Sequence, residues 1–374
     1  SLNKNTTASD NTAVGFCSLN NNTTGADNTA VGYLSLCANT TGANNTALGV
    51  TSLRANTTGC YNTAVGRQSM CANTTGCCNV AMGSNALASG TTGDFNVAVG
   101  GAALGSINTG NDNTAIGASA LTANTTGTGN VSVGALALDA NTTGDSNTAV
   151  GKQALSANTT ADYHTAVGRQ ALFTNTTGTG NTAVGFESLK VNTTGGDNTA
   201  IGLCALCSTT TGSSLVAVGR RALTSNTTGV HNVAVGFNSL FATTTGLCNI
   251  GVGGGALQSN TTGCYNIGIG RFANCANQTS NSNTAVGHES LKLNTAANNT
   301  AANFTAANWT ALTTAGNSPS TDDLVAGAAT DVSNAVYTSG KDATNTNNIY
   351  FSNSPWQLGD PSVNTDSRIT KSNE

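Results

Sequence analysis

The chain carries a hydrophobic pattern that repeats every 17 residues. The phrase Asn-Thr-Ala-Val-Gly begins at Asn11 and recurs with variation at each seventeenth residue up to Asn283, in 17 copies without an insertion or a deletion. Because the loops of globular domains tolerate changes of length, a spacing this strict indicates that each residue stacks on its equivalent in the next copy.

Two rows of large aliphatic residues and two rows of small residues make up this pattern. The consensus is N-T-A-V-G-x-x-A/S-L-x-x-N-T-T-G-x-x, whose positions we number from one to seventeen. Position four holds Val, Leu, Ile or Met, position nine holds Leu or Met except at Asn274, and positions three and eight are mostly Ala or Ser. We expect all four rows to be buried, with positions four and nine as the core. The predicted core residues include Val14, Val31, Val65, Leu19, Leu36 and Leu53.

Short strands fit the repeat better than helices do. Gly at positions five and fifteen and the polar Asn-Thr-Thr-Gly turn interrupt every unit, which disfavours a helix. These glycines mark places where the backbone must turn or take a positive φ. Coils of strands pair with their neighbours at about 4.8 Å, and stacked Asn and Thr rows can form hydrogen-bonded ladders. The sequence therefore predicts an all-β fold, a β-solenoid or β-roll of seventeen coils over residues 1–291.

The core of such a coil is thin, because it holds only one large residue at position four and one at position nine. We therefore expect further burial between neighbouring chains, most simply in a homotrimer around a common axis. A sedimentation mass equal to that of a single chain would contradict this expectation.

The repeat also resembles known fibrous proteins. The Thr-Ala-Val-Gly and Val-Ala-Val-Gly phrases, each followed by x-x-Ser/Ala-Leu, resemble the head repeats of trimeric autotransporter adhesins, which implies a left-handed parallel β-roll in a trimer. The adhesin repeat is shorter than this one. The longer unit with Asn-Thr-Thr-Gly is similar to the arrays of phage tail fibres and related viral or bacterial surface fibres. The resemblance covers residues 1 to about 291.

Two further regions follow the repeat. Residues 292–321 show a five-residue spacing that resembles pentapeptide-repeat coils, and we interpret them as a transition or cap followed by a linker. Residues 322–374 are not repetitive. Their Thr-Asp-Ser-Arg-Ile stretch from Thr365 resembles the junction before the C-terminal intramolecular chaperone of phage tail fibres, although Thr370 intervenes before Lys371. That resemblance makes Thr365 and Ser367 candidates for a processing site, and the alternative is a polar tail.

Composition and charge disfavour several classes of function. The formal net charge is −4 with no acidic or basic block, so no nucleic-acid partner is expected. No run of eighteen apolar residues exists, so no membrane insertion is expected. The three histidines lie at unrelated repeat positions, and no grouping of nucleophile and base stands out. We therefore expect neither an enzyme nor a bound metal or cofactor.

The 11 cysteines occupy only variable positions. They are Cys17 and Cys204 at seven, Cys37, Cys71, Cys207 and Cys275 at ten, Cys60, Cys77 and Cys264 at sixteen, and Cys78 and Cys248 at seventeen. Cys60 and Cys77 share a row one coil apart, and a spacing of about 4.8 Å lies within the Cα reach of a disulfide. That pair is the predicted disulfide. The alternative is free thiols, which suit a reducing cytoplasm.

The Asn-Thr-Thr turn forms an N-glycosylation sequon in most repeats. In a eukaryotic or archaeal secretory context these asparagines would be glycan sites, whereas a structural role in a stacked turn explains the same residues. We favour the structural interpretation, because a glycan on every coil would crowd at the coil spacing.

These features together predict a structural and host-attachment fibre, a viral or phage tail-fibre shaft at the virion surface. A host receptor or glycan would bind at a tip or at the variable positions six, seven, ten, sixteen and seventeen. A trimeric adhesin at the bacterial cell surface is the close alternative. An ice-binding solenoid is an alternative of another class, since Thr rows at positions thirteen and fourteen could form hydroxyl arrays. A glycan-cleaving enzyme would need paired acids on neighbouring coils, and no recurrent pair appears.

Overall fold

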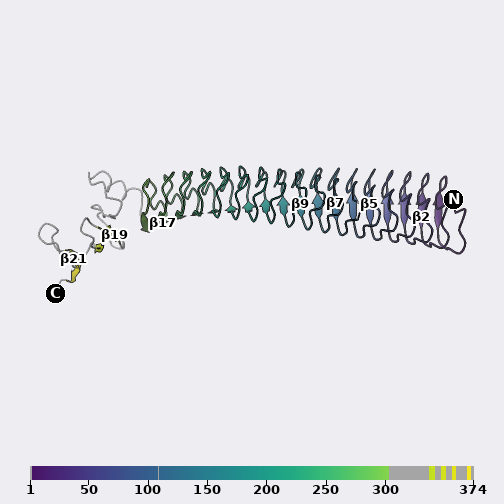
Figure 1. The fold of residues 1–374 in the computed structure, drawn as a ribbon, viewed down its shortest axis with the longest axis horizontal. Helices are drawn as coiled ribbons and strands as arrows, with labels where there is room; N and C mark the ends of the chain where they lie inside the picture. Colours follow the sequence, from purple (N-terminus) through teal and green to yellow (C-terminus); the bar gives the residue numbers. More distant parts are fainter. Residues whose placement is uncertain are drawn as a thin grey trace. The chain divides into compact units, whose positions relative to one another are not determined.

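The computed structural model describes residues 2–107 and 109–302, together with the backbone of four short strands nearer the C-terminus. Two compact units divide the chain, residues 1–220 and residues 221–374. In each unit, every coil of the repeat contributes one strand of three residues and then a run of turns (Figure 1). The described residues contain no helix.

Thirteen strands of the repeat lie in the first unit and five in the second. The first unit holds β1 (Thr12–Val14), β2 (Thr29–Val31), β3 (Thr46–Leu48), β4 (Thr63–Val65), β5 (Val80–Met82), β6 (Val97–Val99), β7 (Thr114–Ile116), β8 (Val131–Val133), β9 (Thr148–Val150), β10 (Thr165–Val167), β11 (Thr182–Val184), β12 (Thr199–Ile201) and β13 (Val216–Val218). The second holds β14 (Val233–Val235), β15 (Ile250–Val252), β16 (Ile267–Ile269), β17 (Thr284–Val286) and β18 (Thr300–Ala302), followed by the antiparallel pairs β19 (Tyr337–Lys341) with β20 (Asn347–Tyr350) and β21 (Trp356–Leu358) with β22 (Ile369–Lys371).

Within each unit the strands of successive coils pair in parallel, with equivalent residues opposite one another. Ala13 lies opposite Ala30, and Ala30 lies opposite Ala47. The 17-residue step of the sequence is thus the step between paired residues. The prediction of an all-β parallel solenoid of about seventeen coils is confirmed.

The interior of each coil is built from six positions. Leu at nine, Ala at three and Ala or Ser at eight are buried, as expected, and Leu19, Leu36 and Leu53 are all fully buried. Asn at positions one and twelve is buried as well, for example Asn28 and Asn39. Gly at position fifteen completes the interior. The core is therefore half polar, which requires each amide to find a partner.

The structure corrects the assignment of position four to the core. Val14 is 58% exposed, and Val31 and Val65 are also partly exposed rather than buried. The reason is the alternation of side chains along a strand. Each strand spans positions two to four, and since Ala at three points inward, the residues at two and four point outward. The large interior residue of each coil is the one at position nine.

Two ladders of asparagine amides satisfy the polar interior. At position twelve, Asn39 Nδ2 donates to Oδ1 of Asn22 in the preceding coil at 2.8 Å and to the carbonyl of Gly42 in its own coil at 2.8 Å. At position one, Asn28 Nδ2 donates to the same Gly42 carbonyl at 2.9 Å, and Asn28 Oδ1 accepts the backbone N–H of Asn45 at 3.0 Å. In coils that carry both asparagines, one carbonyl at position fifteen, here that of Gly42, thus ties the two ladders together.

Glycine is required at positions five and fifteen of the repeat for different reasons. Gly117, at position five, has a φ of +136°, which side chains rarely adopt, and a Cβ there would lie 2.6 Å from the backbone of the next coil. Gly76, at position fifteen, has no positive φ, but a Cβ would lie 2.5 Å from both Asn73 Oδ1 and a carbonyl of the next coil. The expected positive φ is confirmed at position five, whereas position fifteen needs Gly for close approach.

The sequon asparagines at position twelve belong to the interior. Asn22, Asn56 and Asn141 are fully buried, and the Nδ2 atom that a glycan would occupy donates a hydrogen bond in each. A folded coil therefore offers no accessible amide at these sites, which supports the structural role of the turn.

The parallel sheet continues past Leu291, where the 17-residue phase ends. β18 pairs with β17 so that Thr300 lies opposite Thr284, a step of 16 residues. Asn299 takes position one of this coil, and its backbone N–H donates to Asn283 Oδ1 at 2.9 Å. The shortened step falls in the turn after Asn294, so the ladder survives the loss of one residue. The linker expected before residue 322 lies outside the described residues.

Candidate functional surfaces

A stripe of aliphatic side chains follows the outer face of the parallel sheet. This aliphatic stripe consists of the position-four residues, one in each coil. Its most exposed members are Val14, Leu48 and Met82, at 58%, 48% and 45%. Position two, which holds Thr, Val or Ile, shares the same face. Extended apolar patches on a single chain mark surfaces that contact another molecule, so the stripe is the first candidate for assembly.

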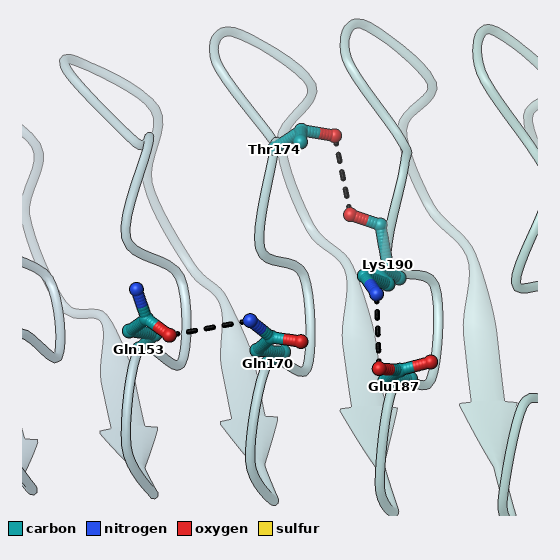
Figure 2. Close-up of polar contacts among 5 residues, drawn as sticks. All are labelled: Gln153, Gln170, Thr174, Glu187 and Lys190. Atoms are coloured by element: carbon teal, nitrogen blue, oxygen red, sulfur yellow. Dashed lines mark hydrogen bonds and ion pairs between the residues drawn. The ribbon is translucent and has the colours of Figure 1, made fainter.

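Positions seven and ten form a second surface, on the outer turn that follows each strand. Figure 2 shows Gln153, Gln170 and Glu187 at position seven of three successive coils. Gln170 Nε2 donates to Gln153 Oε1 at 3.2 Å. Lys190, at position ten, reaches back to position seven of its own coil, with 2.9 Å between its Nζ and Glu187 Oε1. We call this surface the seven–ten row. It brings variable side chains into contact both within a coil and between coils.

Aromatic rings and cations gather at variable positions of the outer surface. Phe16 and Tyr33 stack with their ring centroids 5.6 Å apart. The guanidinium of Arg169 lies 5.6 Å from the centroid of Phe186. Tyr163, at position seventeen, is 71% exposed. Exposed ring faces with a polar edge suit contacts with sugars and with protein surfaces. The expectation that variable positions hold the recognition residues stays a prediction.

The predicted disulfide partners Cys60 and Cys77 lie in neighbouring coils but do not turn toward each other. Cys77 Sγ accepts the backbone N–H of Cys60 at 3.1 Å. The thiols themselves donate to carbonyls of their own coils, Cys60 to Thr58 and Cys77 to Thr75. All 11 cysteines are reduced thiols in the structure. The Cys60–Cys77 bond therefore stays a prediction, and the thiols serve here as part of a backbone-bonded row.

The threonine rows proposed for ice binding are partly occupied by internal bonds. Thr23 Oγ1, at position thirteen, donates to the carbonyl of Thr40 at 2.9 Å, and Thr40 Oγ1 donates to the carbonyl of Thr57 at 3.0 Å. Thr24 and Thr41, at position fourteen, are exposed. The position-thirteen hydroxyls thus donate to the next coil, whereas the position-fourteen residues Thr24 and Thr41 lie at the surface, and ice binding stays a prediction.

His164 replaces an asparagine in the position-one ladder and imitates it. Its Nδ1 accepts the backbone N–H of Asn181 at 3.2 Å, as an Asn Oδ1 does elsewhere, and the ring also bonds the carbonyl of Gly178. The ring is 1% exposed, and burial lowers the pKa of His164 from 6.5 to about 4, partly offset by these backbone bonds and by the nearby Asp162 carboxylate. The neutral imidazole is therefore the form that the ladder holds.

Three further features concern metal binding, the membrane and proteolytic processing. Across the described part of the chain, no three His, Cys, Asp or Glu side chains gather as metal ligands would. No helix in the same residues has the length and apolar character needed to cross a membrane. The processing-site candidates Thr365 and Ser367 lie outside the described residues.

Comparison with known proteins gives no relative for this chain. No protein-family model, no curated protein and no solved structure matches it. The fold and the surfaces described above are therefore the basis for the function proposed below.

Three features of these surfaces were not anticipated from the sequence. The aliphatic stripe was expected in the core, and neither the ladder role of His164 nor the contact between positions seven and ten was predicted. The sequence gives no clear signal for the last of these, because opposite charges at i and i+3, as at Glu187 and Lys190, are otherwise typical of a helix surface.

Proposed function

We propose that this chain is the shaft of a homotrimeric attachment fibre, of the kind that viral tail fibres use at the virion surface. The observation that carries the proposal is the aliphatic stripe along the stacked coils within each unit. A uniform stack gives reach and stiffness, and each coil adds one more aliphatic residue to the same face. The repeat phrases that resemble tail-fibre and adhesin arrays support the same reading.

The stripe supplies a driving force for association. Burying a Val, Leu or Ile side chain completely stabilises a structure by roughly 1.5–3 kcal/mol. A side chain that a single chain leaves about half exposed therefore gains roughly 1 kcal/mol when a neighbouring chain covers it. In the first unit, six position-four residues are 36–58% exposed, namely Val14, Leu48, Met82, Ile116, Val150 and Ile201. The other seven are less exposed, so each of them gains less. Such a sum is comparable with the cost of association, about 4–15 kcal/mol.

Sedimentation of the full chain tests the assembly. A single chain has a mass of 37.0 kDa, so the trimer sediments with three times that mass. The double variant Ile116→Lys and Val150→Lys places charges on the stripe and is expected to sediment as a single chain. The matched control is Thr126→Lys with Thr143→Lys, two exposed residues at position fourteen, away from the strands. It should keep the trimer mass.

A single-chain mass for the unmodified protein would overturn the homotrimer. If the stripe variants keep the trimer mass, assembly uses another face.

The attachment role rests on the variable outer positions. Binding of the labelled chain to bacterial cells and to purified surface polysaccharides tests it, and loss of binding in Tyr163→Ala would locate the contact on position seventeen. Absence of binding to any cell surface, with the trimer intact, would leave a purely structural shaft. A membrane anchor encoded downstream in the same gene would favour the bacterial adhesin over the virion fibre.

A further inference from the structure

One coil of the first unit places two cysteines at the positions whose side chains meet. Cys204 stands at position seven and Cys207 at position ten of the coil that begins at Asn198. The preceding coil carries Glu187 and Lys190 at the same two positions, in contact at 2.9 Å (Figure 2). The geometry that forms an ion pair in one coil therefore brings two thiols together in the next.

The same contact recurs elsewhere, so it belongs to the repeat rather than to one pair of charges. Glu289 and Lys292 occupy positions seven and ten of a coil in the second unit and lie 2.7 Å apart, between Oε1 and Nζ. The backbone explains the recurrence. Positions seven and nine both take a positive φ, 51° at Cys204 and 53° at Leu206, and this double turn returns position ten to the side of position seven.

The two thiols are hydrogen-bonded to each other and remain reachable from solvent. Cys207 bonds the side chain of Cys204, and both residues are partly exposed. Burial and the neighbouring thiol raise the pKa of Cys207 to about 12, with a smaller contribution from the Glu187 carboxylate that Lys190 opposes. Cys207 therefore keeps its proton and donates it toward Cys204.

No other coil has this arrangement. Each remaining cysteine at position seven or ten has a different residue type at the partner position of its own coil, namely Asn20 for Cys17, Leu34 for Cys37, Gln68 for Cys71 and Phe272 for Cys275. The Cys60 and Cys77 thiols, in adjacent coils, donate to backbone carbonyls instead of to each other. The seven–ten contact singles out one pair among the 11 cysteines.

We propose that Cys204 and Cys207 form a reversible dithiol–disulfide site that exchanges with low-molecular-weight disulfides. The Cys204 thiolate attacks one sulfur of the small disulfide, which forms a mixed disulfide and releases one small thiolate. That thiolate takes the Cys207 proton, and the Cys207 sulfur then attacks the Cys204 sulfur and displaces the second small thiolate, which is protonated by solvent. In total two protein thiols are oxidised, one small disulfide is reduced, and two small thiols leave.

The disulfide would change the surface reversibly and would add little to the stability of the fold. The closed ring spans only residues 204 to 207, and disulfides that close short loops remove little entropy from the unfolded chain. Oxidation instead changes the seven–ten row by joining two side chains. The inference does not depend on the attachment role proposed above, because it concerns one coil of a single chain.

Peptide mass spectrometry, after oxidation of the folded chain, tests the proposal directly. The chain is incubated with oxidised glutathione, alkylated with iodoacetamide and digested with trypsin. Cleavage after Lys190 and Arg220 releases a peptide, residues 191–220, that contains Cys204 and Cys207 and no other cysteine. We expect this peptide to carry no alkyl group and to be lighter than its dithiol form by the mass of two hydrogens. Treatment with dithiothreitol should restore both thiols.

Two variants make the outcome specific. Cys204→Ser should leave Cys207 alkylated or carrying one glutathione, without an internal bond. The double variant Cys60→Ser with Cys77→Ser should leave the oxidation of peptide 191–220 unchanged. Glutathione adducts on both cysteines of the unmodified chain, full alkylation after oxidation, or closure that proceeds equally well in urea would each overturn the proposal, because the folded coil would then not be what brings the sulfurs together.

Discussion

The buried imidazole of His164 makes the stability of the solenoid depend on pH. The perturbation is to lower the pH from 7.5 to 4 and to compare the protein with His164→Asn, which restores the amide found at this position in neighbouring coils. In the folded chain Nδ1 accepts the backbone N–H of Asn181. A proton on Nδ1 would set two donors against each other in the interior, so protonation opposes the folded state.

The sign and the size follow from the two pKa values. Unfolding returns His164 to its ordinary pKa of 6.5, whereas burial holds the pKa at about 4 in the folded chain. Between pH 6.5 and pH 4 the unfolded state therefore binds a proton at His164 that the folded state does not bind. The free energy of unfolding falls as the pH drops through this range. A difference of roughly 2.5 pKa units corresponds to about 3 kcal/mol at pH 4.

Urea unfolding at a series of pH values measures this loss, and hydrogen exchange of the Asn181 amide reports it locally. Carboxylates titrate in the same range, but the variant His164→Asn contains the same carboxylates. The difference between the two proteins therefore isolates the imidazole. We expect them to diverge by about 3 kcal/mol between pH 7 and pH 4, with the unmodified protein losing more. Parallel curves would refute the reasoning, since they would mean that His164 accepts its proton equally well folded and unfolded.

Three further substitutions test the account of the interior. Asn192 Oδ1 is buried without a hydrogen-bond partner, because Thr209 stands where the next amide of the ladder belongs; Thr209→Asn should raise the free energy of unfolding by about 1 kcal/mol in urea titrations. Asn274 takes the place of the position-nine Leu with both amide atoms unsatisfied, so Asn274→Leu should stabilise by about 2 kcal/mol and raise the urea midpoint, and no increase would contradict the burial argument. Gly117→Ala should destabilise by at least 1–3 kcal/mol, whereas Gly101→Ala, where a Cβ meets nothing within 4 Å, should leave the thermal midpoint unchanged.

The period of the sequence was enough to predict the fold, because a strict spacing in a stacked structure is a geometric requirement. It did not show which aliphatic row faces inward. Val14 and Leu19 are equally apolar, and only the alternation along a three-residue strand, with Ala13 inside, decides that Val14 is outside. Applying this alternation to the Thr-Ala-Val phrase would have placed the row correctly from the sequence.

The residue types did not reveal the backbone conformation of the turns. Leu19 has a φ of 49°, and leucines at position nine repeat this left-handed conformation along the chain, although a bulky residue rarely adopts it. Two backbone hydrogen bonds hold it there, from the Leu19 N–H to the Ser35 carbonyl of the next coil and from the Asn22 N–H to the Leu19 carbonyl within the coil. The contact between Cys204 and Cys207 depends on this turn. When the cysteines are grouped by repeat position, Cys204 and Cys207 fall into different groups. The turn nevertheless brings their side chains together.

The bonding from coil to coil also determines how such a chain responds to tension. Each coil is held by bonds to its immediate neighbours, so a pull on one end loads the terminal coil first and detaches the coils one after another, as a zipper opens. A released coil of 17 residues extends by about 50 Å. The chain therefore lengthens under load in small steps of similar size, one coil at a time, before it breaks.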